Sequence, residues 1–273
     1  MTATVSNFSY GAVTPIAAYL MACLGAALGL RCTTRSLRRP HHKNGWLALG
    51  AIAIGCGIWT MHFIAMIGFS VQNALISYDT TKTLLSLAIA IAVVAIGVFL
   101  VGHRGRSPMT LATAGTVTGL GVAAMHYVGM AAIHTTGTLN YDTMTVVLSV
   151  AIAVAAATAA LWAAVSIHAL WASLGASLVM GVAVTGMHYT GMAAVSVHLT
   201  GGATTAQSST HLLSFLLVML AGPLMVLLIA AGIVMFDPDM MLSDDDWDRA
   251  APAPHGTGTA HPVQQQSQPY TTW

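Results

Sequence analysis

The chain contains no glutamate, and only 6% of its 273 residues are charged. A soluble globular domain usually carries about 25% charged residues, so this scarcity excludes the ordinary soluble classes. Hydrophobic residues make up 56% of the chain, and the mean hydropathy is +0.75. We therefore expect an integral membrane protein whose main partner is the lipid bilayer, with no nucleic-acid ligand.

Cysteine is scarce as well. Cys23, Cys32 and Cys56 form no Cys-x-x-Cys pair, so we expect small buried residues and no disulfide framework. The N-terminus lacks the positively charged stretch of a cleaved signal peptide, so the first apolar run is expected to remain in the mature protein.

Seven apolar runs have the length of about 20 residues that a helix needs to cross a bilayer. They are 11–32, 45–69, 83–102, 108–133, 143–166, 169–197 and 211–236. We predict an all-α membrane protein with seven transmembrane helices over residues 11–236, after an outer N-terminal segment, 1–10. Residues 237–273 are rich in Asp, Pro, Gly, Thr and Gln, which predicts a disordered tail.

The positive charges predict the orientation. The connections after the second, fourth and sixth runs hold only Lys82, whereas most Lys and Arg residues flank the connections after the first and third runs. Short loops rich in Lys and Arg stay in the cytoplasm, so we expect a multi-pass protein of the inner (plasma) membrane, with its N-terminus outside and its C-terminus cytoplasmic. The charged residues of these two connections are Arg31, Arg35, Arg38, Arg39, Lys43, Arg104 and Arg106.

One unusual hexapeptide, Met-His-aromatic-x-small-Met, occurs three times, starting at Met61, Met125 and Met187. The nearly constant interval indicates an internal repeat. Residues 76–80 also resemble 139–143, so the predicted unit is a helix, an outer loop and a helix. Three such units give six helices, and the first run stands outside the repeat. Because each unit contributes two spans, equivalent residues should lie at equal depth, unlike those of inverted repeats.

Each hexapeptide places a histidine and a methionine one helical turn apart on the same helix face. Polar side chains within a bilayer usually face the bundle interior, and three histidines at one depth are simplest to satisfy with a metal ion. Imidazole together with thioether sulfur favours copper, mainly Cu(I). The candidate ligands are His62, His126, His188, Met66, Met130 and Met192, with Met61, Met125 and Met187 as weaker candidates because they lie about 100° round the helix.

Further residues near the same membrane face are auxiliary candidates: His134, His198, His211, Asp79 and Asp142. Each aspartate precedes a helix and has a second interpretation as an N-cap. The histidines and methionines also have a structural interpretation, as hydrogen-bonded and packed core residues. A copper-handling permease remains a further alternative, although the helices below the histidines offer few polar residues. We expect no enzyme activity, because no nucleophile–base pair stands out, but copper redox chemistry stays open.

The repeated motif resembles that of the MHYT domain, a bacterial membrane sensor module. Met187-His188-Tyr189-Thr190 matches the motif in full, whereas the copies at Met61 and Met125 depart at later positions. The resemblance covers about residues 11–236. It implies a seven-helix domain that binds copper through the Met and His residues of the motif and senses oxygen, carbon monoxide or nitric oxide. Members are often fused to GGDEF, EAL or kinase output domains. No such domain is visible here, so a separate cytoplasmic or membrane signalling partner is expected.

Overall fold

The computed structural model describes residues 2–72, 76–135, 137–167, 169–199 and 209–236. The chain divides into residues 1–234 and 235–273, and the following account concerns the first of these units. The predicted disordered tail, 237–273, lies outside the described residues. The helices are α1 (Val13–Arg38), α2 (Lys43–Ile67), α3 (Thr80–Arg104), α4 (Pro108–Ala131), α5 (Thr143–Ser166), α6 (Leu170–Ala193) and α7 (Ser209–Met235), and a short 3₁₀ turn, η1 (Pro40–His42), joins α1 to α2.

The described helices confirm the all-α membrane class. Six of them, all except α4, are long and apolar enough to cross a membrane by length and composition. α4 has a length similar to the others, but four glycines and four threonines lower its hydropathy. A crossing by α4, and with it the full count of seven spans, therefore stays a prediction.

The largest difference in helix bounds concerns α1, which continues to Arg38. Arg31, Arg35 and Arg38 were expected near or in a loop, but they lie in the last turns of this helix. Cations are favourable at a helix C-terminus because of the helix dipole, so Arg35 and Arg38 in the last turn stabilise the longer helix.

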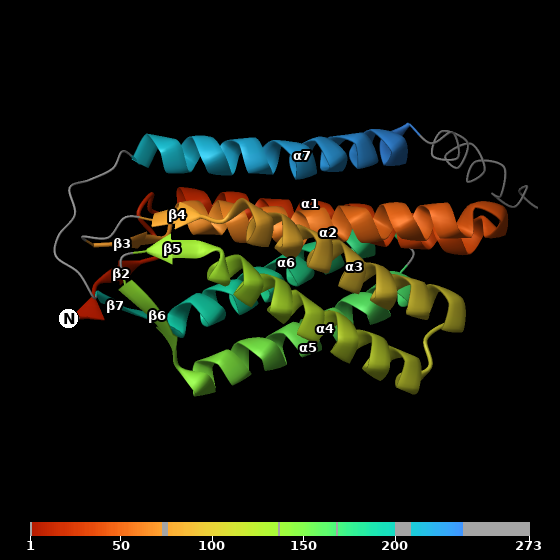
Figure 1. Ribbon diagram of the computed structural model, residues 1–273. Helices are drawn as coiled ribbons and strands as arrows, with labels where there is room; N and C mark the ends of the chain where they lie inside the picture. The colour runs from red at the N-terminus through yellow and green to blue at the C-terminus, as the bar shows by residue number, and fades with distance from the viewer. Residues whose placement is uncertain (1, 73–75, 136, 168, 200–208, 237–273) are drawn as a thin grey trace, which may run out of the picture. The chain divides into compact units, whose positions relative to one another are not determined.

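Short strands gather at one end of the helices, where the sequence predicted simple outer loops (Figure 1). They form three antiparallel sheets, β1-β7-β6, β2-β3 and β4-β5. Alternation of apolar and polar residues, as at Val195, Val197 and Leu199, was a strand signal, but most of the strands are too short to show it. Their bounds are β1 (Thr2–Ala3), β2 (Val5–Ser6), β3 (Ser70–Val71), β4 (Ile76–Tyr78), β5 (Ile133–Thr135), β6 (Gly137–Tyr141) and β7 (Val195–Leu199).

The strand pairs divide the chain into three strand–helix–helix–strand units. These are β2-α1-α2-β3, β4-α3-α4-β5 and β6-α5-α6-β7, and in each the first strand pairs with the last. One backbone hydrogen bond recurs beside each pair. It joins Ser9 N to Gly68 O at 3.0 Å, Asp79 N to Ala132 O at 2.9 Å, and Asp142 N to Ala194 O at 2.9 Å. The second and third units therefore repeat the local geometry of the first.

This packing groups the helices differently from the predicted helix–loop–helix units. Each of the helices α1 to α6 packs against the next, and α6 packs against α1, so the six helices form a closed ring. A β-carbon on Gly25 would lie 2.8 Å from Gly57 Cα, so α1 and α2 approach as closely as only glycine allows. α1 thus belongs to the ring, although the sequence placed the first run outside the repeat.

α7 is the helix that lies outside the ring (Figure 1). Its Phe215 ring stacks on Tyr78, with centroids 6.3 Å apart. At its other end, the Arg35 guanidinium donates a hydrogen bond of 2.8 Å to Val234 O, and it also lies 5.1 Å from the centre of the Trp46 ring. A cation at the C-terminal carbonyls of a helix is favourable, so α1 holds the end of α7.

Candidate metal centre

The three histidines of the repeated motif meet on the inside of the helix ring. Nδ1 of His62 lies 3.0 Å from Nδ1 of His188 and 3.2 Å from Nδ1 of His126. The ring centroids are 5.0, 5.0 and 5.1 Å apart, and the ring planes are nearly perpendicular to one another. All three side chains are buried. The predicted convergence of these residues is thus observed.

The helix repeat explains why they meet. His62, His126 and His188 each lie five residues before the end of their helix, at Ile67, Ala131 and Ala193. With a rise of about 1.5 Å per residue, each imidazole lies about 7 to 8 Å from the end of the bundle that carries the strands. Equal depth on three helices of one ring, with all three side chains buried inside it, brings the imidazoles together.

The methionines of the motif separate into two groups, and all six are buried. Met66, Met130 and Met192 share one cluster with strand-end residues such as Phe69 and Ile133. The other three, Met61, Met125 and Met187, belong to the main core of the bundle. The first group therefore lies one helical turn nearer the strands than the histidines.

Glycines of the motif allow the imidazoles to approach the neighbouring helix. A β-carbon on Gly129 would lie 2.6 Å from Nε2 of His62, and one on Gly191 would lie 2.5 Å from Nε2 of His126. His62 and His126 thus pack on the backbone of the next motif helix. The small residue three positions after each histidine was visible in the sequence, but its role in seating an imidazole was not predicted.

Aromatic pairs join successive units around the histidines. Phe63 lies 6.1 Å from Tyr78, and Tyr127 lies 5.8 Å from Tyr141, as measured between ring centroids. The third pair is formed by Tyr189 and Phe8, stacked at 5.4 Å. Phe8 was missed because residues 5–10 lack the Tyr-Asp signature that marks the equivalent strands.

The donor set fits a metal ion. In a neutral imidazole one nitrogen carries a hydrogen and the other a lone pair, so each nitrogen makes a single hydrogen bond. Nδ1 of His62 has two Nδ1 neighbours and can therefore bond to only one of them. An ion accepts several lone pairs at once. Metal–nitrogen distances of about 2.0 to 2.1 Å in a trigonal arrangement separate the nitrogens by about 3.5 Å, close to the spacings observed. Nδ1 atoms would bind the ion.

The opposite nitrogens lack the hydrogen bonds that usually orient metal-bound histidines. Nε2 of His62 and Nε2 of His126 are buried without a partner among the described residues. The glycine backbones beneath them and the perpendicular neighbouring rings fix the imidazoles instead. Packing therefore replaces hydrogen bonding as the orienting force at this site.

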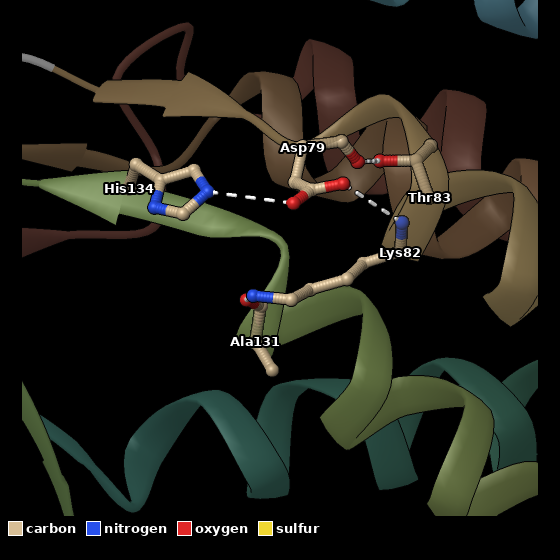
Figure 2. A network of polar contacts seen from close by, with 5 residues as sticks. All are labelled: Asp79, Lys82, Thr83, Ala131 and His134. Atoms are coloured by element: carbon tan, nitrogen blue, oxygen red, sulfur yellow. Dashed lines mark hydrogen bonds and ion pairs between the residues drawn. The ribbon is translucent and has the colours of Figure 1, made fainter.

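The auxiliary candidates do not join this cluster. His134 is exposed, and its Nε2 lies 3.7 Å from Asp79 Oδ2. A dashed line joins the two side chains in Figure 2. In the same network, Lys82 Nζ donates to Ala131 O, the last residue of α4, at 3.1 Å. His198 is exposed on β7. The side chain of His211 lies outside the described part of the chain.

The two aspartates are N-caps, as one of the interpretations predicted. Asp79 Oδ1 accepts from Lys82 N at 3.0 Å, and Asp142 Oδ2 accepts from Thr145 N at 2.8 Å. The hydrogen bond from the Lys82 backbone lowers the pKa of Asp79. Hydrogen bonds from Thr145 lower the pKa of Asp142. Both carboxylates are thus engaged at helix ends.

A family described as a bacterial signalling protein N-terminal repeat, MHYT, matches residues 55–114 and 119–177. His62 and His126 stand at the same position in the two matches. The chain belongs to the MHYT family. The third copy, at His188, lies beyond the matched residues and is equivalent by its motif and by its place in the ring.

Curated relatives of this MHYT protein are signalling proteins. It is 40% identical over 197 residues to the bifunctional diguanylate cyclase/cyclic di-GMP phosphodiesterase MucR of Pseudomonas aeruginosa, covering 70% of this chain and 29% of the relative. It is 35% identical over 204 residues to the cyclic di-GMP phosphodiesterase NbdA of the same organism, covering 72% and 26%. The signaling protein YkoW of Bacillus subtilis is 27% identical over 187 residues, covering 66% and 23%.

The chain thus spans less than a third of the length of each of these relatives. No solved structure matches the chain.

Proposed function

We propose that this MHYT protein is a membrane sensor that holds one copper ion on Nδ1 of His62, His126 and His188. The observation that carries the proposal is the convergence of three buried imidazole nitrogens from three repeats. Met66, Met130 and Met192 are further ligand candidates, and Met61, Met125 and Met187 are weaker ones because they pack into the main core.

The surroundings favour Cu(I) over a divalent ion. Burying charge in an apolar environment is costly, and a single charge costs less than a double one. The aspartates nearest this end of the bundle, Asp79 and Asp142, cap helices and supply no compensating charge to the histidines. Imidazole and thioether donors suit this soft ion.

The sensing step is proposed from the same site. A diatomic gas, namely oxygen, carbon monoxide or nitric oxide, would act by binding the ion and changing its coordination. Such a ligand signals only if it favours one of two packings of the ring. The proposed output is a separate partner protein, and the names of the relatives favour cyclic di-GMP turnover as its chemistry. The described domain itself is proposed to be non-catalytic.

The test is metal content. The protein is purified in detergent, loaded anaerobically with Cu(I) and, in separate samples, with Cu(II) and Zn(II), and bound metal is counted per chain. We expect one Cu(I) per chain, and loss of it in His62→Ala, His126→Ala and His188→Ala alike. X-ray absorption then separates nitrogen from sulfur ligands.

His134→Ala is the matched control, because this histidine is exposed and lies apart from the cluster. It should bind copper as the wild type does. Wild-type protein without bound metal, or motif variants that bind normally, would contradict the proposal and favour the structural interpretation of the histidines. Copper lost from only one motif variant would contradict the shared site. The permease alternative predicts copper transport into vesicles, which the sensor does not.

A further inference from the structure

An apolar cavity of about 60 Å³ lies inside the ring. It lies further along the helices than the histidines, on the side away from the strands, and this direction is called inward. Ile58, Val122 and Val184 line it, and each lies four residues before the histidine of its own helix. Ile54, Thr118 and Met180 line it one turn further in. With a rise of about 1.5 Å per residue, the cavity lies about 6 to 12 Å inward of the three imidazoles, on the axis of the ring.

Small side chains leave this space unfilled, and most of them are alanines of α5. Ala153, Ala157 and Ala164 face it, together with one larger residue, Leu161, and α3 contributes Val94 and Val98. Val94 and Ala157 are equivalent, since each lies fifteen residues after the aspartate that caps its helix. The third unit thus lacks two methyl groups at this position of the ring. Protein interiors are normally close-packed, so a cavity of this size needs such a local cause.

The lining excludes stable water. A cavity needs only about 10 to 15 Å³ to admit one water, so the size is sufficient, but each water also needs two to four polar partners. Thr118 is the one hydroxyl residue in the lining, and its Oγ1 points to Val93 O at 3.4 Å. The other lining side chains are aliphatic or thioether. Apolar cavities of this kind stay dry and bind small apolar molecules.

We infer that the ring contains a binding site for a small, uncharged, apolar molecule, such as a dissolved gas, on the axis one to two helical turns inward of the histidines. An occupant contacts Ile58, Val122 and Val184 and so touches the turn that precedes each imidazole. The site is formed by packing alone and does not require a metal ion. It is therefore independent of the proposed copper function, and each can fail without the other.

Xenon is the probe. Crystals of the metal-free, full-length protein are pressurised with xenon, and anomalous scattering locates the atoms; in parallel, ¹²⁹Xe NMR in detergent measures binding in solution. We expect xenon between Val122 and Ala157 in the wild type. Ala157→Leu fills the cavity from α5 and should abolish binding. Ala155→Leu is the matched control, because the same change on an exposed face of the same helix should retain it.

Ala157→Val is the second cavity-filling variant, to be used if Ala157→Leu fails to fold, because valine occupies the equivalent position of α3. It should weaken xenon binding relative to Ala155→Leu. A wild type without xenon, or variants at Ala157 that bind as the wild type does, would overturn the inference. Ordered water or a lipid acyl chain filling the wild-type cavity would overturn it as well.

Discussion

Two of the three histidines are held on their Nε2 side by backbone, and the seating of these two depends on glycine. Gly129 lies beneath His62 and Gly191 beneath His126. Because these imidazoles are buried and ringed by one another, neither has room to retreat from an added methyl group. The first motif copy carries Ala65 at the equivalent position, so the need for glycine concerns the seats of His62 and His126.

Gly129→Ala should displace His62 and weaken copper binding. The added β-carbon would lie 2.6 Å from Nε2, and overpacking of this kind costs about 1 to 3 kcal/mol. Thermal unfolding in detergent and bound copper per chain measure the two effects.

Gly186→Ala is the control for this prediction. A β-carbon at Gly186 meets nothing within 4 Å, so this motif-neighbouring glycine does not serve a close helix approach. The change should stabilise α6 by about 0.5 to 1 kcal/mol, since alanine is the better helix former, and leave copper content unchanged. Equal copper binding by the two variants would contradict the seating role of Gly129.

At this scale, the sequence was informative about which residues meet but not about how they meet. The constant spacing of the motif and its place in alternate helices predicted the convergence of His62, His126 and His188. Spacing carries no information on ring orientation, so the approach of Nδ1 rather than Nε2 was not predictable. The exclusion of His134 from the cluster depends on strand β5, which was also not predicted.

At the scale of the elements, β2 and α1 form the first half of a strand–helix–helix–strand unit, although their sequence does not resemble the first half of the other two units. β2 and α1 occupy in the first unit the place that β4 and α3 occupy in the second. Phe8 pairs with Tyr189 where the other units use tyrosines. The ring is thereby closed by a segment that repeat detection could not find.

Phe8→Ala should loosen this closure. An aromatic pair contributes about 0.5 to 1.5 kcal/mol beyond its buried area, so we expect a lower free energy of unfolding by about that amount. Amides of β2 and β3 should exchange hydrogen faster. Tyr10→Ala is the matched control, since Tyr10 is similarly exposed and makes no described ring contact. If both variants exchange alike, the Phe8 stack does not hold the strand.

The helices themselves were largely predictable, because each is a long apolar run. The bounds of α5, 143–166, agree with the prediction, and those of α3 and α4 differ by only a few residues. Their grouping was not predictable, since α1 and α7 are both long enough and apolar enough to cross a membrane and the choice between them depends on packing. Gly25 against Gly57 favours α1, and α7 offers no such close approach in its described part.

Across the whole molecule, the strands lie at one end of the ring and the basic connections at the other (Figure 1). This separation gives the predicted orientation a direct test. Thr138→Cys on β6 and Ser107→Cys before α4 are both exposed, whereas the native cysteines are all buried. In intact cells, a membrane-impermeant maleimide should label Thr138→Cys, and Ser107→Cys should be labelled only after permeabilisation. The reverse pattern would place the N-terminus in the cytoplasm.

The pairing of β1 with β7 has a consequence for biosynthesis. Thr2 and Ala3 are made before all of the helices and find their partners His198 and Val197 only after six helices have been made. His188 is also the last of the three histidines to be synthesised. The nascent protein therefore cannot close its ring or complete its cluster until almost the whole bundle is in place, and a chain stalled after α4 would have two of the three histidines and a β1 strand without its partner.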